Sequence, residues 1–178
     1  APSAQPGSAA ATVDGESVAT TLSRINNQLV ISFGSIKITV SAVDKSGQVL
    51  PLDAEGNLRL DKDRQVRLQM TNMAVGADVQ VWLFSTPTRL GSFIVGSTGE
   101  LNEVVEVSKD VPDGNHRLVV QQETKRGSRM VFAVGVIIGP KSSSNWSIRW
   151  IVLPPLGLAS IAALVIPARR RRRKSATA

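Results

Sequence analysis

The sequence predicts an all-β protein: an Ig-like antiparallel β-sandwich of about eight or nine strands, followed by a single C-terminal transmembrane helix. Three observations support this prediction. Apolar and polar residues alternate over many short stretches, which is the two-residue period of a half-buried strand. Turn-forming sequences separate these stretches, and nothing before Trp146 combines a 3.6-residue period with helix caps. Finally, residues 150–168 carry no charge. A closed barrel is the alternative architecture.

The expected strands follow one another at short intervals. The clearest is 36–42, where Ile36, Ile38 and Val40 alternate with polar residues. The last, 129–138, is apolar on both faces, which is typical of a strand at the centre of a sheet. The other expected strands are 18–22, 29–33, 66–70, 79–84, 91–95, 104–107 and 117–122, with a short candidate at 58–60.

The composition divides the chain into five parts. Residues 1–12 are mostly Ala, Pro, Ser, Gly and Gln, so we expect a disordered linker. Residues 13–139 form the expected sandwich ectodomain. The remaining expected parts are a juxtamembrane tether (140–147), a transmembrane helix (148–168) and a basic cytoplasmic tail (169–178). A linker at the start indicates either a removed signal peptide or a longer protein, and we favour the longer protein.

The C-terminal segment has the pattern of a membrane anchor. Its 19 uncharged residues are close to the roughly 20 needed to cross a bilayer. Trp146 and Trp150 lie one helical turn apart, where we expect them at the membrane interface. A stop-transfer block follows, made of Arg169, Arg170, Arg171, Arg172, Arg173 and Lys174. Because positive charge stays in the cytoplasm, the sandwich should face outward from the plasma membrane.

The charge distribution argues against a nucleic-acid partner. The net charge is +7, but the terminal basic block supplies six of the 21 basic residues and Arg149 a seventh. The other 14 balance the 14 acidic residues, so residues 1–148 are formally neutral. A neutral domain does not attract phosphates over a distance. The partner that the sequence predicts is the lipid bilayer.

Residues with catalytic chemistry are sparse. The chain has no cysteine and one histidine, His116, which we expect to position the turn after Gly114 rather than to act as a base or a metal ligand. No phosphate loop or nucleophile elbow is present. We therefore expect no enzyme activity, no metal and no cofactor. Trp82 is expected either in a second apolar layer or as a lone exposed anchor.

Several segments occur in the order of a known type of module. Val81–Gly91 contains Ser-Thr-Pro-Thr and then Leu-Gly, and 111–118 reads Val-Pro-Asp-Gly-Asn-His-Arg-Leu. With the turn at Gly127, residues 13–139 resemble a β-sandwich module near the C-termini of actinobacterial cell-surface and adhesin-like proteins. Asn72–Gly76 departs from that pattern, which tends to have a proline-containing glycine-rich turn. The resemblance implies surface exposure and supplies no catalytic residues.

These observations lead to three functional hypotheses. The first is a non-catalytic, membrane-proximal spacer that displays other parts of the protein. The second is an adhesin whose loops contact a surface protein or glycan, with Ser85, Thr86, Pro87, Thr88, Asp113 and Asn115 as candidate ligand residues. The third is covalent wall anchoring by a sortase. It is disfavoured because Leu153–Gly157 has Leu156 where a sortase signal has threonine, and because the motif lies inside the apolar run.

Overall fold

The computed structural model describes residues 1–61, 64–123 and 127–141, which contain twelve strands in two sheets. Sheet A has the order β2 (Glu16–Val18), β1 (Ala9–Val13), β12 (Arg129–Ile138), β11 (Gly114–Glu123), β8 (Asp78–Phe84) and β9 (Thr88–Ile94), and β6 (Leu58–Leu60) also pairs with β12. Sheet B has the order β10 (Leu101–Glu106), β7 (Gln65–Thr71), β5 (Ile36–Val43), β4 (Gln28–Phe33) and β3 (Thr21–Ile25).

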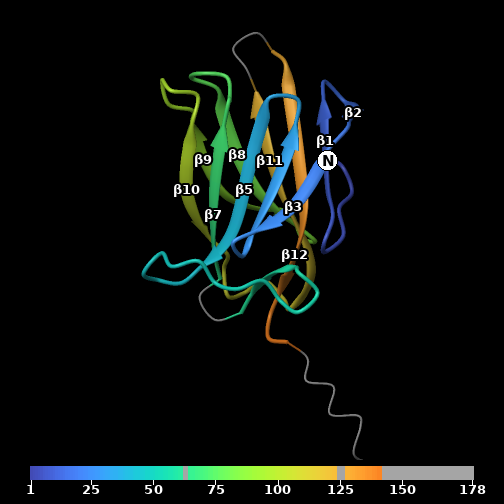
Figure 1. The fold of residues 1–178 in the computed structure, drawn as a ribbon, viewed down its shortest axis with the longest axis vertical. Helices are drawn as coiled ribbons and strands as arrows, with labels where there is room; N and C mark the ends of the chain where they lie inside the picture. The colour runs from blue at the N-terminus through green and yellow to red at the C-terminus, as the bar shows by residue number, and fades with distance from the viewer. Residues whose placement is uncertain (62–63, 124–126, 142–178) are drawn as a thin grey trace, which may run out of the picture. The chain divides into compact units, whose positions relative to one another are not determined.

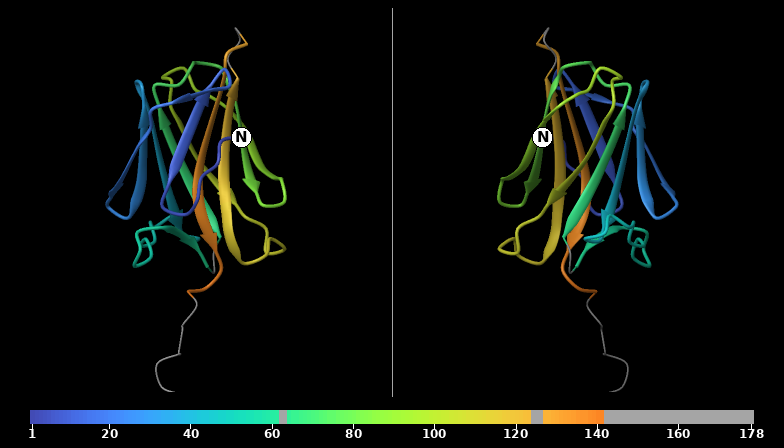
Figure 2. Two further views of the ribbon diagram at one scale, coloured as in Figure 1. Left: turned by 90° about the vertical axis from the view of Figure 1, so that its right-hand side faces the viewer. Right: turned by 90° about the vertical axis from the view of Figure 1, so that its left-hand side faces the viewer.

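The two sheets form the layers of a sandwich: Figure 1 looks onto their faces, and the views of Figure 2, turned by 90°, show the layers from the side. All the strand pairs are antiparallel except β6 with β12. The core lies between the sheets and follows the alternation in the sequence. For example, Val66, Leu68 and Met70 of β7 are fully buried, and the polar residues between them are only partly covered. The predicted all-β sandwich is therefore confirmed.

Strand β12 is the central element of sheet A. One side pairs with β11 along ten residues. The other side pairs with β1 over residues 130–134 and with β6 over residues 136–138. Nine of its ten residues are buried or half-buried, because the strand is covered on both faces as well as both edges. The expectation that the final apolar run is a central strand is confirmed.

The expectation that residues 1–12 are disordered is wrong. Ala9–Val13 is a strand of sheet A, and Ala11 is 2% exposed in the main core. The alanine-rich composition favoured a linker. In the structure, however, β12 has an edge free for pairing at this position, and a strand of small side chains pairs with it. The Asp14-Gly15 turn then reverses the chain into β2, with both residues at positive φ.

The prediction of a single strand at 18–22 is also wrong. The alternation there is real, but the chain changes sheets within it: β2 ends at Val18 in sheet A, and β3 begins at Thr21 in sheet B. Periodicity cannot detect such a crossing, because both strands continue the same alternation. With β1 and β2 added, the described residues contain more strands than the eight or nine expected.

The expected tether, transmembrane helix and basic tail lie almost entirely outside the described residues, as do Trp146, Trp150 and Arg169–Lys174. Within the described ranges, no helix has the length and apolar character needed to cross a bilayer.

Candidate functional site on the outer face of sheet A

A second apolar cluster lies on the face of sheet A that points away from the core. Val119 of β11 and Val131 and Ala133 of β12 form it together with Ala4, which is 4% exposed. Trp82 and Phe84 of β8 pack against its side. Of the two alternatives for Trp82, the structure therefore shows the second apolar layer. Because a strand places alternate residues on opposite faces, β8 contributes to both clusters.

The N-terminal residues 1–6, here called the strap, cover this cluster. Pro6 forms a bridge to Gly135 of β12, and the Gly135 N–H donates to the carbonyl of Ser8 at 3.1 Å. A Cβ at Gly135 would lie 2.0 Å from backbone atoms of Gln5, so only glycine lets the strap approach this closely. The carbonyl of Pro2 accepts a hydrogen bond from Arg117 at 3.1 Å.

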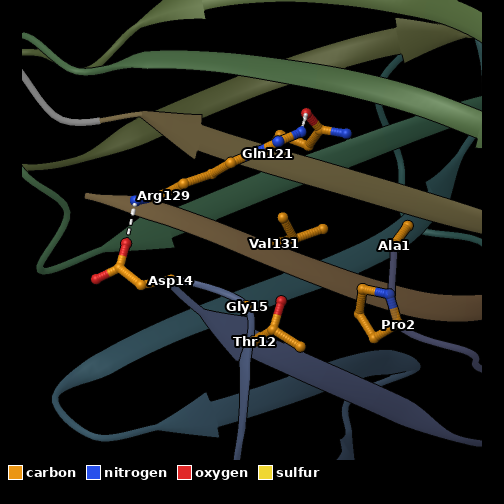
Figure 3. Close-up of a pocket in the computed structure, with 8 residues that line it drawn as sticks. All are labelled: Ala1, Pro2, Thr12, Asp14, Gly15, Gln121, Arg129 and Val131. Carbon is orange, nitrogen blue, oxygen red and sulfur yellow. Dashed lines mark hydrogen bonds between the residues drawn. The ribbon is translucent and has the colours of Figure 1, made fainter. Parts of the chain in front are cut away.

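A hollow of about 680 Å³ opens on this face between the strap and the β1–β2 turn (Figure 3). Its floor comes from three neighbouring strands: Thr12 of β1, Arg129 and Val131 of β12, and Gln121 of β11. Ala1 and Pro2 form one wall, and Asp14 and Gly15 form the opposite one. The lining therefore combines three apolar side chains with hydrogen-bonding groups and charged groups of both signs.

Asp14 and Arg129 have different roles in this hollow. One carboxylate oxygen of Asp14 accepts from the backbone N–H of Arg129 at 2.7 Å, and the other accepts from the Ser128 hydroxyl at 3.1 Å. Asp14 thus fixes the start of β12. The exposed Arg129 side chain donates to the amide oxygen of Gln121 at 2.7 Å. Among the described residues, no carboxylate forms an ion pair with it.

A smaller hollow, of about 340 Å³, lies on the other side of the strap. Ser85, Asn115 and His116 line it together with Phe84, Arg117 and strap residues. The guanidinium of Arg117 stands over the Phe84 ring, 5.8 Å from its centre. One candidate ligand residue from each of the two predicted loops, Ser85 and Asn115, therefore lines this hollow, and Asn115 lies at the start of β11.

His116 holds these loops together. Its Nε2 lies 2.9 Å from the Pro112 carbonyl, which can only accept, so in the neutral ring Nε2 carries the proton. Nδ1 then accepts from the Ser85 hydroxyl at 2.8 Å. The ring is 4% exposed. His116 therefore holds the segment before Gly114, through Pro112, and not a turn after Gly114 as expected, because β11 already begins at Gly114. The ring also fixes the β8–β9 loop.

The remaining predicted ligand residues do not gather at this hollow. Asp113 pairs with Arg64 at 2.9 Å, and Arg64 also donates to carbonyls of the same loop, so Asp113 has a structural role. Thr86 and Pro87 lie exposed in the β8–β9 turn, and Thr88 begins β9 with its hydroxyl bonded to the Thr86 carbonyl. Among the described residues, no group of carboxylate or histidine side chains could hold a metal ion.

Sequence reasoning missed Thr12, Asp14, Gln121 and Arg129. The signal for their arrangement was the Asp-Gly pair at 14–15, which is a strong hairpin indicator. Recognising it would have predicted β1 and β2. It would not have revealed the strap, because no local pattern indicates which residues cross the outside of a sheet.

Comparison with models of protein families finds no match, and comparison with curated proteins also finds none. Among solved structures, the chain is similar to the extracellular domain of a putative hybrid two-component system from B. thetaiotaomicron. The identity is 13%, the TM-score is 0.37, and the match covers 67% of this chain. It covers 20% of that chain, so the present protein spans about a fifth of its length.

Proposed function

We propose that this protein is a non-catalytic cell-surface protein in which an Ig-like β-sandwich acts as a membrane-proximal spacer or display domain. A single transmembrane helix over 148–168 anchors it in the plasma membrane. The sandwich faces outward, and residues 169–178 lie in the cytoplasm. The resemblance to actinobacterial adhesin-like proteins implies surface exposure, which supports this arrangement.

The observation that carries the proposal is the place of β12 in sheet A. This strand is the last one in the part of the chain that the structure describes, and it has a strand partner on both edges. A spacer held by its C-terminal end transmits force through that strand. When force pulls on a strand that is paired on both edges, the ladder hydrogen bonds on both edges bear the force together. A strand at the edge of a sheet has such hydrogen bonds on one side only.

Membrane fractionation tests the proposal. The full chain should remain in the membrane pellet after carbonate washing, because an apolar helix of this length partitions stably into the bilayer. A chain ending at residue 141 is the matched control and should be recovered in the soluble fraction. Release of the full chain by carbonate would contradict the anchor. Retention in the cell wall after detergent extraction would instead indicate covalent attachment by a sortase.

A second candidate function is an adhesin. The observation that favours it is that Ser85 and Asn115, from two predicted ligand loops, line one hollow with the strap. Cells displaying the full chain should then adhere to a surface protein or glycan. The adhesion should fall when Asn115, whose side chain is exposed, is changed to a bulky residue such as tryptophan. Equal adhesion by cells displaying an unrelated sandwich would exclude this role.

A further inference from the structure

We propose that the end of the sandwich at which β11 finishes and β12 begins holds a binding site for a small uncharged molecule that joins an apolar group to an acceptor oxygen, such as an ester carbonyl. The inference goes beyond the display role, because it assigns a ligand chemistry to the domain itself. It rests on a pocket between the two sheets and on a buried amide nitrogen without a partner. This end is opposite to the one at which β12 finishes (Figure 1).

The pocket, here called the end pocket, opens between the two sheets and has a volume of about 340 Å³. Its lining comes from both layers: Val13, Gln122, Ser128 and Met130 from sheet A and its β12 entrance, and residues 35–36 and 72–74 from the start of β5 and the end of β7. The amide nitrogen of Asn72 donates to the Ser35 carbonyl at 2.7 Å and ties the two segments of sheet B together. The volume lies in the lower part of the range of small-molecule sites.

The lining of the end pocket is adaptable and uncharged. Two of the three methionines of the chain, Met73 and Met130, form its buried part and are 5% and 6% exposed. Methionine side chains are flexible and polarizable, so they adjust to apolar groups of different shape. No lining residue carries a charge. An ion that entered would lose its hydration without gaining a counter-charge, so the lining favours an uncharged ligand.

Gln122 supplies a polar group to the end pocket. Its side chain lies on the inner face of β11, because it follows Leu118 and Val120 of the core at the two-residue period of a strand. The residue is 3% exposed, and its amide nitrogen is buried without a hydrogen-bond partner in the described structure. An unpaired buried donor costs free energy.

A ligand oxygen in the end pocket would remove this cost. The last torsion of a glutamine side chain is broad, so the amide of Gln122 can turn toward the pocket that its side chain lines. The apolar part of the ligand would then lie against Met73 and Met130. One donor beside an apolar lining therefore selects a molecule with one acceptor oxygen and an apolar group.

The experiment follows the methionine methyl groups by NMR, using the full chain with isotope-labelled methionine in lipid nanodiscs. The probe is methyl hexanoate, whose free concentration is measured by dialysis. The signals of Met73 and Met130 should shift saturably at millimolar ester. The signal of Met70, which is 0% exposed and lies outside the end pocket, should not move. Hexanoate, the corresponding ion, should bind at least about tenfold more weakly, because the lining offers no counter-charge.

A matched pair of substitutions locates the site. Ala74→Trp places a large side chain at an exposed position in the lining and should abolish the shifts. Val75→Trp adds the same side chain at the neighbouring exposed position, which does not line the end pocket, and should leave binding unchanged.

Gln122→Leu tests the amide donor separately from the fold. This variant should bind the ester about fivefold more weakly, which corresponds to the loss of one neutral hydrogen bond. Its urea midpoint should stay the same or rise, because the substitution removes an unpaired buried group. A merely structural role of Gln122 would instead lower the midpoint.

Four results would overturn the proposal: no methionine signal moves with the ester, hexanoate binds as tightly as the ester, Ala74→Trp and Val75→Trp bind alike, or Gln122→Leu keeps full affinity. Loss of folding in Gln122→Leu would overturn it as well, since the amide would then be needed for the sandwich itself. None of these results bears on the anchor, which membrane fractionation tests independently.

Discussion

Two polar side chains, His116 and Asp53, fasten loops of the sandwich. His116 joins the Pro112 loop to Ser85 through both ring nitrogens. Asp53 accepts from the backbone N–H groups of Glu55 and Asn57 and pairs with Arg59 at 3.3 Å. In both cases a single side chain closes a loop that the strand ladders do not reach. These two side chains therefore hold the loops in a defined conformation, and they do not determine the fold of the sheets.

Replacing His116 tests its role as a brace. His116→Phe removes both hydrogen bonds and leaves the Pro112 carbonyl without its partner, so the free energy of unfolding should fall by about 1–3 kcal/mol. Asn115→Ala, at the exposed neighbouring position, should change it by less than about 0.5 kcal/mol. Urea denaturation measures both. A serine-directed fluorophosphonate probe should leave Ser85 of the wild-type chain unlabelled, and labelling that depends on His116 would contradict the non-catalytic role.

The pKa of the Asp53 carboxyl gives a pH-dependent test. Burial by itself raises this pKa, but hydrogen bonds from Asn57 and Glu55 and the charge of Arg59 together hold it below its ordinary value. A lowered folded pKa stabilises the protein above the unfolded pKa of about 3.9, and that stability is lost as the pH falls through the folded value.

Asp53→Asn should therefore destabilise the sandwich at pH 7 by about 1–3 kcal/mol, because Arg59 and the turn amides lose a charged acceptor. The difference from wild type should shrink as the pH falls below about 4. Thermal unfolding measured from pH 7 to pH 2.5 gives both results. Glu55→Gln, an exposed carboxylate in the same turn, is the control and should have little effect. A difference that is constant across the pH range would exclude the proposed linkage.

At the scale of the element, most strands could be predicted, because each buries one face and therefore alternates. β5, β7 and β8 lie within a residue or two of the expected ranges. β1 could not be predicted from alternation, because the side chains in Ala9–Val13 are nearly uniform in size and polarity. Its stability comes from the free edge of β12, about 120 residues later in the chain. The outer-face site depends on β1 and the strap, so it was missed with them.

A pair of substitutions in β1 tests this correction. Ala11 points into the main core, and its neighbour Ala10 points to the opposite face and is partly exposed. Ala11→Asp should lower the free energy of unfolding by about 3 kcal/mol or more, because an unpaired charge is buried. Ala10→Asp should cost less than half as much. Equal, negligible effects in denaturant titrations would mean that residues 1–12 are disordered after all.

At the scale of the whole molecule, the apolar residues of the sequence follow two different patterns. Most apolar side chains of the described residues between 9 and 138 lie between the two sheets or under the strap. The uncharged segment 150–168 has no such alternation, and the proposal above places it in the bilayer. The sandwich could be predicted because its pattern is local. The site on the outer face of sheet A could not, because it depends on contacts between residues far apart in the sequence.

Cysteine labelling in intact cells tests the central claim most directly. The chain has no cysteine, so a single introduced thiol reports one position. Lys45→Cys lies in an exposed turn of the sandwich, and Ala176→Cys lies in the basic tail. A membrane-impermeant maleimide should label position 45 in intact cells and position 176 only after the cells are opened. Labelling of position 176 from outside, or protection of position 45, would contradict a sandwich displayed outward on a single transmembrane helix.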